Sequence, residues 1–393
     1  MNPKTPHICI ALMDDPYYKQ SAIRVAGALA RAGYKVTLVG RRLPGASGGG
    51  TTTAQAGVGK AGASGGGPAA ASQPFRQVRF SCLFKKGVTS YAEMNIRLFF
   101  YLLFHKVDLV CAVNLDTILP CWMISVIKRV PRVYDARELF TEMAELVARP
   151  RIQKVWLRIE RGMVPRFPNG YAVCQSIADE FHRRYGVQYA VVRNMTVLED
   201  HPRSPRPLEG PYLLYQGAVN HGRGLGALIP AMRSIGLPLV ICGSGNYMRE
   251  CRELVKHYGL ESRIVFTGQL MPTALRQYTD HAYAGINLVE REGLNQYYSL
   301  PNKLFDYLHA GVPQVTMDYP EYQRVQAAFE VAVLIPELTE EEIVRATQHL
   351  IEDPLLYSRL RNNCEPARRL FNWQAEEPVL VEVFRRLMPV NIR

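Results

Sequence analysis

Short runs of apolar residues alternate with segments of helical periodicity along most of the chain. The first run spans residues 7–13, and the segment 21–32 after it places apolar side chains at Ile23, Val25 and Leu29, the spacing of one helix face. A second apolar run covers residues 34–39. This β-α-β order predicts a parallel sheet with a right-handed crossover.

The alternation continues to residue 193 and then starts again. The first stretch predicts strands over 78–84, 108–113, 131–134, 170–174 and 189–193, with helices over 91–106, 117–129, 151–161 and 176–185. The second predicts strands over 212–215, 238–242, 264–266, 284–288, 314–317 and 331–335, with helices between them. These α/β halves predict two Rossmann-like domains whose parallel sheets face each other across a cleft.

These patterns divide the 393 residues into four parts. We expect an N-terminal domain over 1–196, a proline-rich linker over 197–211, a C-terminal domain over 212–370, and a last helix within 371–393 that packs back toward the N-terminal domain. Residues 44–74 form an insertion of low complexity within the N-terminal domain. We expect this insertion to be disordered, because Gly, Ala, Ser and Thr give it little apolar surface to bury.

Charge is divided unevenly between the halves. Residues 1–196 hold 27 Lys and Arg against 12 Asp and Glu, a net charge of +15, whereas residues 197–393 hold 20 against 23, a net charge of −3. An anionic membrane surface, a lipid phosphate, an acidic glycan or nucleic acid would suit the basic half, and simple solubilising charge is the alternative. Nucleic acid is the least expected partner, because the basic half has no nucleic-acid-binding motif.

The remaining composition indicates a soluble protein. The longest apolar run, residues 98–104, is far below the roughly 20 residues that span a bilayer, and the start of the chain does not read as a signal peptide. The eight cysteines are scattered, and the nine histidines form no ligand spacing. We therefore expect free thiols in the cytoplasm and no metal site.

The segment 297–313 carries the clearest chemical signal. Ser299 is expected to cap a helix whose first turn contains Pro301, and Gly311 followed by Pro313 is expected to end it. Lys303 would lie at the positive end of this helix, where free N–H groups attract phosphate. Asn302 and Asp306 would share another face. An ordinary amphipathic helix is the alternative interpretation.

Two glycine-bearing loops of the second half would converge on the same cleft. The loop from Gly217 to Gly224 includes Asn220 and Arg223, whose guanidinium can hold phosphate oxygens in a fork. The turn Gly243-Ser244-Gly245 and Gly268 would contact the base or the sugar. Arg223 and Lys303 would grip a diphosphate from two sides, which stabilises a leaving group without a metal.

The second half resembles the donor domain of family-4 retaining glycosyltransferases, which have the GT-B fold. The segments YQGAVNHGRGLGALIPAM, ICGSG, RIVFTG and SLPNKLFDYLHAGVP occur in the family's order. The resemblance implies that Arg223 and Lys303 are catalytic contacts to the diphosphate and that Asp306 holds the ribose. Ala218 stands where many members have Arg. The other donor-binding residues expected are Gly217, Asn220, Gly243, Ser244, Gly245, Gly268, Tyr298, Ser299 and Asn302. At Tyr298 many members of the family have a Glu.

The first half resembles the acceptor domain of the same subgroup, in which YD-x-H-E-[LYF]-F-T-E is typical. Here Asp135 and Glu138 are kept and Arg137 stands where His is usual. The resemblance places Asp135, Arg137 and Glu138, with Asp116, at the lip of the cleft, where they would contact donor or acceptor. A capped, solvated helix start is the alternative interpretation of these acids.

The resemblance implies a cytoplasmic glycosyltransferase with no cofactor. Its substrate would be a nucleoside-diphosphate sugar, and the acceptor would be a glycan or a lipid-linked or cell-envelope molecule. Transfer would retain the anomeric configuration and need no metal. The basic half would bring the enzyme to the inner face of an anionic membrane. The alternatives are a nucleotide-sugar epimerase of the same fold and a non-catalytic binding or scaffold protein.

Overall fold

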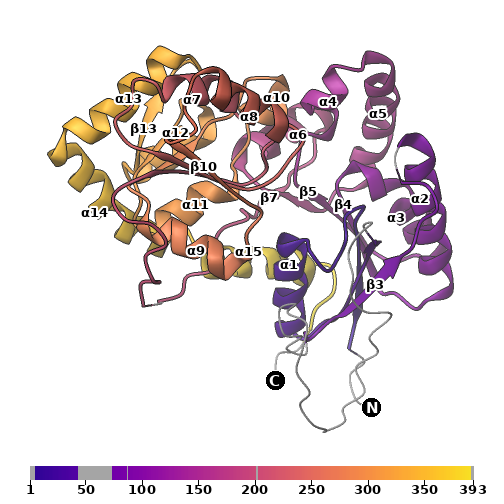
Figure 1. Ribbon diagram of the computed structural model, residues 1–393. Helices are drawn as coiled ribbons and strands as arrows, with labels where there is room; N and C mark the ends of the chain where they lie inside the picture. The colour runs from indigo at the N-terminus through magenta and orange to yellow at the C-terminus, as the bar shows by residue number, and fades with distance from the viewer. Residues whose placement is uncertain (1–4, 43–72, 86, 201, 391–393) are drawn as a thin grey trace, which may run out of the picture.

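The computed structural model describes residues 5–42, 73–85, 87–200 and 202–390. All but the last two residues of the low-complexity insertion lie outside the described residues. Two α/β domains lie side by side, the first drawn in indigo to magenta and the second mainly in orange and yellow (Figure 1). The predicted α/β fold with two domains of parallel strands is confirmed.

The N-terminal domain is built on a seven-stranded sheet in the order β3-β2-β1-β4-β5-β6-β7. Every strand pair in it is parallel. Its elements are β1 (His7–Ala11), α1 (Gln20–Arg31), β2 (Lys35–Arg41), β3 (Arg76–Phe80), α2 (Gly87–Phe104), β4 (Leu109–Val113), η1 (Leu115–Thr117), α3 (Ile118–Lys128), β5 (Arg132–Ala136), η2 (Phe140–Glu142), α4 (Ala144–Val147), α5 (Pro150–Met163), η3 (Val164–Arg166), β6 (Gly170–Ala172), α6 (Gln175–Tyr185) and β7 (Ala190–Val191).

The second domain repeats this plan on a six-stranded parallel sheet in the order β10-β9-β8-β11-β12-β13. The helix α10, just before the predicted phosphate-binding helix, was not expected from the sequence. The elements are β8 (Leu213–Gln216), α7 (Leu225–Ala231), β9 (Leu239–Cys242), α8 (Met248–His257), β10 (Ile264–Gly268), α9 (Pro272–His281), β11 (Ala284–Asn287), α10 (Gly293–Tyr297), α11 (Asn302–His309), β12 (Gln314–Met317), α12 (Pro320–Ala328), β13 (Ala332–Ile335), α13 (Glu340–Glu352), α14 (Pro354–Leu370) and α15 (Trp373–Arg385).

Both sheets are buried on their two faces, which explains why the strands read as continuous apolar runs. In β1, Ile8 and Ile10 join one core cluster while Cys9 and Ala11 join another on the opposite face. Successive side chains of a strand alternate between faces, so each short run supplies both layers. Among the described residues, no helix has the length and hydropathy needed to cross a membrane.

The last helix, α15, returns to the N-terminal domain. It begins at Trp373, where the side chain of Asn372 accepts a hydrogen bond from the N–H of Ala375 (3.0 Å). Trp373, Leu380 and Phe384 enter the core cluster that contains β1. Figure 1 shows α15 beside α1, with which it is in contact. The end of the chain therefore fastens one domain to the other.

We expect Leu380→Ala to lower the free energy of unfolding by about 3 kcal/mol, because it leaves a cavity in this core. Leu380 is fully buried, whereas the neighbouring Val379 is 41% exposed. Val379→Ala is the matched control and should change stability by less than about 1 kcal/mol. Urea unfolding followed by fluorescence measures both variants. Equal losses would show that α15 does not depend on this packing.

Candidate functional site

The site lies where the strand order of each sheet reverses. In the first sheet the reversal falls between β1 and β4, and in the second between β8 and β11. Ligands of open α/β sheets bind beyond the carboxyl ends of the strands at such points. The segments that follow these four strands carry Asp14, Asp116, Arg223 and Glu290.

Helix α11 is held against the second sheet by Tyr307. The ring lies so close to β11 that a Cβ added at Gly285 would be 2.4 Å from it. Its hydroxyl donates to the carbonyl of Leu214 (2.8 Å) and accepts from the N–H of Gln216 (3.1 Å). These contacts fix the N-terminus of α11 relative to the loop after β8.

The start of this helix corrects one prediction. Ser299 does not cap it, because its hydroxyl donates instead to the carbonyl of Gln296 (2.8 Å) in α10. Pro301 occupies the N-cap position with extended backbone (φ −72°, ψ 145°), and the helix begins at Asn302. The unexpected α10 ends only four residues before Pro301 and takes the serine hydroxyl. The helix ends as predicted, with Gly311 in the left-handed region (φ 69°).

Lys303 is buried although no acid is paired with it. The residue is 9% exposed, its Nζ lies 4.1 Å from the ring centroid of Tyr215, and it has no hydrogen-bond partner among the described residues. Burial, and then repulsion by Arg223, holds the pKa of Lys303 well below its usual range. A buried amine of this kind is stabilised by any anion that reaches it.

Arg223 is the second cation of the site. Its flanks are fixed, because the N–H of Glu290 donates to the carbonyl of Gly222 (3.0 Å) and the Glu290 carboxylate accepts from the N–H of Gly224 (3.3 Å). The guanidinium itself makes no hydrogen bond or ion pair within the described part of the chain. Arg223 and Lys303 are therefore neighbouring cations with no acid paired to either among the described residues, an arrangement that suits an anion.

The two glycine loops touch through their backbones. A Cβ at Gly243 would lie 1.8 Å from the carbonyl oxygen of Gly217, and one at Gly245 would lie 2.1 Å from that of Val219. The Asn220 side chain accepts from the N–H of Asn246 (3.0 Å) and so links the loops. Only glycine permits this approach.

Two further residues of the predicted donor site lie at the edge of these loops. Ser244 is exposed, and its hydroxyl contacts Gln269 (3.3 Å). Gly268 has a left-handed backbone (φ 72°) with open space around it. Neither position is covered by other side chains, so a ligand such as a nucleotide base could approach both.

The remaining residues predicted to bind the donor contact the N-terminal domain. Asp306 accepts from the hydroxyl of Thr196 (2.7 Å) and from the amide of Gln216 (3.1 Å), and the Asn302 side chain accepts from Asn194 (2.7 Å). Burial raises the pKa of Asp306 despite these hydrogen bonds. Tyr298 packs against the core of the N-terminal domain. The sequence did not indicate these contacts across the domain boundary.

A cavity of ≈ 360 Å³ lies between the domains. Asp135, Arg137 and Glu138 line it from the first domain, and Leu300 and Asn302 line it from the second. Asp135 is fully buried and forms an ion pair with Arg137 (2.7 Å), so these two residues hold each other. Glu138 makes no such pair with a cation among the described residues and is the freer group.

Three acids gather on the N-terminal side of the cleft. Burial raises the pKa of Asp116 well above its usual range, and Asp14 and Glu138 add to the shift by repulsion. Burial and Asp14 also raise the pKa of Glu138, against which Lys19, Arg137 and Arg223 act. Asp116 is therefore more easily protonated than an exposed carboxyl. The influence of Arg223 on Glu138 shows that the two domains face each other here.

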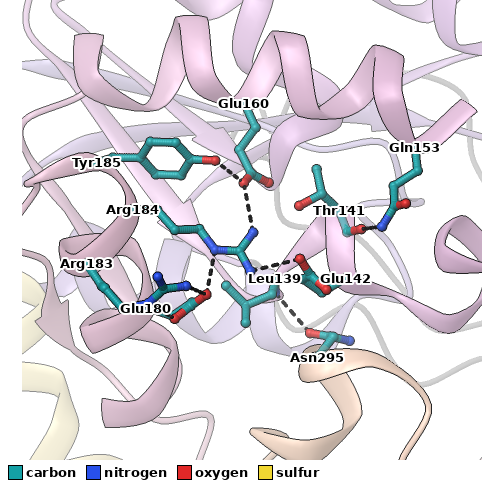
Figure 2. Close-up of polar contacts among 10 residues, drawn as sticks. All are labelled: Leu139, Thr141, Glu142, Gln153, Glu160, Glu180, Arg183, Arg184, Tyr185 and Asn295. Atoms are coloured by element: carbon teal, nitrogen blue, oxygen red, sulfur yellow. Dashed lines mark hydrogen bonds and ion pairs between the residues drawn. The ribbon is translucent and has the colours of Figure 1, made fainter. Parts of the chain in front are cut away.

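The segment 138–142 after β5 forms the lip of the cleft, and a cluster around Arg184 of α6 supports it (Figure 2). Arg184 contacts the carboxylates of Glu142 (2.8 Å), Glu180 (2.5 Å) and Glu160 (3.8 Å). Tyr185 donates a further hydrogen bond to Glu160 (2.5 Å). Burial keeps the pKa of Glu160 above its usual range. One cation thus holds three elements together.

The second domain docks directly on this lip. The N–H of Leu139 donates to the side chain of Asn295 in α10 (2.9 Å), as Figure 2 shows. A Cβ at Gly293 would lie 2.3 Å from the carbonyl oxygen of Glu142. The Arg184 cluster therefore supports the surface on which α10, and after it α11, is placed.

Some residues of the site were missed by the sequence analysis. Asp14 and Glu290 follow β1 and β11, and their position after apolar runs could have singled them out. Tyr215, Thr196 and Arg184 had no such signal, because their partners are distant in the chain. Among the described residues, no group of three or more His, Cys, Asp or Glu could hold a metal ion.

Comparison of the sequence with known protein families gives a match to the part of the chain that carries this site. Residues 197–367 match the family described as "Glycosyl transferases group 1". The match covers the linker and nearly all of the second domain, including Arg223 and Lys303. No curated protein matches the chain by sequence.

Comparison with solved structures identifies the fold as GT-B. The sucrose-phosphate synthase of Thermosynechococcus elongatus has a TM-score of 0.74 and 17% identity, with 97% of this chain and 99% of that chain covered. HepE of Anabaena, in complex with UDP and glucose, has a TM-score of 0.73 and 13% identity, covering 97% and 100%. WaaG, a glycosyltransferase involved in lipopolysaccharide biosynthesis, has a TM-score of 0.69 and 15% identity, covering 98% and 100%.

We expect Arg184→Met to lower the free energy of unfolding by roughly 3 kcal/mol at neutral pH, because it leaves three carboxylates without their shared cation. Arg183, which binds the same Glu180, is 68% exposed and gives the matched control Arg183→Met, for which we expect a loss below about 1 kcal/mol. Denaturant unfolding measures both.

The pH dependence has a defined sign. Hydrogen bonds from Arg183 and then Arg184 lower the pKa of Glu180 in the folded state, so its contribution is present above its unfolded pKa and lost as pH falls. The loss of stability caused by either variant should accordingly shrink in acid, where the parent also loses the contribution of Glu180. Equal stabilities at neutral pH would contradict the role given to Arg184.

Proposed function

We propose that the protein is a retaining glycosyltransferase that moves a sugar from a nucleoside-diphosphate donor to a glycan or a lipid-linked or cell-envelope acceptor. One observation carries the proposal: Lys303, at the start of α11, lies near Arg223 of the loop after β8, and neither is paired with an acid among the described residues. Two such cations suit a diphosphate, whose negative charge increases as the sugar bond breaks.

The other residues of the cleft fit the remaining parts of such a donor. The glycine loops offer Gly217, Gly243, Gly245, Ser244 and Gly268 for backbone contacts to base and sugar. Asp306 keeps lone pairs that ribose hydroxyls can use, since each of its oxygens accepts one hydrogen bond. The structures of HepE, which hold UDP or UDP-glucose, support a nucleotide donor.

The acceptor would enter from the N-terminal side. Glu138 and Asp116, which follow β5 and β4 at the cleft, would bind its hydroxyl groups. In the proposed reaction a donor phosphate oxygen takes the proton of the attacking hydroxyl, so the sugar keeps its configuration and no protein base is needed. We also propose that no metal takes part, because Arg223 and Lys303 supply the positive charge. The free cysteines suit a reducing cytoplasm.

A second candidate is a nucleotide-sugar epimerase of the same architecture. It is favoured by the acids Asp14, Asp116 and Glu138, which gather in one cleft and can exchange protons with a sugar. Product analysis of the donor without any acceptor separates the two. An isomerised sugar would support the epimerase, and an unchanged sugar the transferase.

The proposal predicts that one nucleotide sugar in a panel of UDP, GDP, ADP, CMP and dTDP sugars raises the melting temperature. A ligand that binds only the folded state stabilises by mass action, by about 2.7 kcal/mol at a hundredfold excess over its Kd. The shift should persist in EDTA. No shift with any nucleotide would favour a non-catalytic protein, and a shift only with Mg²⁺ would reject metal independence.

Lys303→Met should abolish turnover and raise the melting temperature of the free protein, because the buried amine is unfavourable without an anion. Since the pKa of Lys303 is lowered in the free site, a diphosphate should raise it, and nucleotide binding should take up protons at neutral to alkaline pH. Calorimetry in buffers of different ionisation enthalpy measures this uptake. The exposed Lys256 gives the control Lys256→Met. Unchanged proton uptake in Lys303→Met would contradict the assignment.

A further inference from the structure

Two helices of the N-terminal domain expose stripes made only of apolar side chains. On α2 Ile96, Phe100 and Phe104 recur every four residues and Val88 lies two such steps earlier, and on α3 the stripe follows one helix face. Phe104 is 77% exposed and Val88 75% exposed. We call these residues the apolar outer face: Val88, Ile96, Phe100 and Phe104 of α2 and Leu119, Met123, Val126 and Ile127 of α3.

The two stripes form one surface. Helices α2 and α3 pack against each other, and Figure 1 shows them together on the flank of the N-terminal domain that points away from the second domain. Of 20 large apolar side chains exposed among the described residues, 13 fall between residues 83 and 155. Scattered exposed apolar residues are ordinary, but such a concentration marks an interaction surface.

Positive charge borders this face. The neighbouring helix α5, in contact with α3, exposes Arg151, Lys154, Arg158 and Arg161 next to Ile152 and Val155. At the ends of the two helices Lys128 donates to the carbonyl of His105 (2.6 Å). The cations lie at the rim and the apolar stripes between them.

Negative charge on these three helices is neutralised. Glu93 of α2 pairs with Arg97 (2.9 Å) and accepts from two backbone N–H groups. Glu160 of α5 is buried in the Arg184 cluster, and α3 has no acid. The face thus combines an apolar centre with a cationic border.

We propose that the apolar outer face docks on an anionic lipid bilayer, with α2 and α3 lying in the interface and their stripes inserted among the acyl chains. An apolar stripe on a helix with cations beside it is the arrangement that interfacial helices use. The residues of the stripes carry no hydrogen-bonding side chain, which suits hydrocarbon, Glu93 and Arg97 beside the α2 stripe are paired with each other, and the border complements acidic headgroups. This inference goes beyond the proposed function and holds whether or not a sugar is transferred.

Vesicle flotation with the full chain tests the inference. The protein should float with vesicles of phosphatidylcholine and phosphatidylglycerol but far less with phosphatidylcholine alone, and salt should weaken the binding. The triple variant Ile96→Ser, Phe100→Ser, Phe104→Ser should reduce partitioning at least about tenfold at the same salt concentration. The triple Val265→Ser, Met271→Ser, Leu355→Ser changes exposed residues of the second domain and should leave it unchanged.

A spectroscopic probe separates insertion from adsorption through charge alone. A tryptophan placed by Phe100→Trp should be quenched by brominated acyl chains, whereas Leu355→Trp should not. Both triple variants should keep the parent melting temperature and its shift with nucleotide, so failure here is distinguishable from failure at the donor site.

Three results would overturn the inference. They are absence of binding to acidic vesicles, binding that the α2 triple variant does not weaken, and absence of quenching at position 100. Light scattering adds a fourth: a parent dimer that the α2 variant converts to a monomer, with vesicle binding unaffected, would assign the face to a second copy of the chain.

Discussion

An ammonium group held in an almost dry position without an acid is unfavourable, and the second domain is arranged around this constraint. Tyr215 offers its ring face to Lys303, which returns part of the lost hydration energy. Tyr307 fixes α11 on the sheet, and Glu290 fixes the loop of Arg223. The proposed diphosphate site would thus be preorganised for an anion, at a cost in folding stability from the buried amine.

The same helix also joins the domains. Thr196 and Asn194, at the end of the first domain, bind Asp306 and Asn302 of α11, while Asn295 of α10 binds the lip at Leu139. Close to these contacts the N–H of Trp373 donates to the carbonyl of Thr196 (3.0 Å), and α15 enters the core of the first domain. The segment that carries Lys303 is therefore positioned by both domains, and the acids of the first domain are set opposite the cations of the second.

The sequence predicted those features that depend on neighbours along the chain. Alternating apolar runs gave nearly all strands, and Gly311 marked the end of α11. Lys303 was placed near an anion site because a helix start has free N–H groups. The prediction that Ser299 caps α11 was wrong, because its hydroxyl binds α10 instead. A helix of five residues such as α10 is too short to show a periodic pattern in the sequence. The hydrogen bonds of Asp306 and the three partners of Arg184 depend on contacts between distant residues, which no local pattern encodes.

The apolar outer face was hidden in the sequence for a similar reason. The run at residues 98–104 reads as a buried helix, yet its side chains divide between a core at Leu98 and Leu102 and a surface at Phe100 and Phe104. The inner side of α2 also reaches the cleft, since Asn95 donates to the carbonyl of Asp116 (2.9 Å). A bilayer bound to the outside of α2 would thus lie one helix away from the acids proposed to bind the acceptor. This short path would suit an acceptor that is itself anchored in the membrane, and a bilayer on this side would account for the excess positive charge of the first half of the chain.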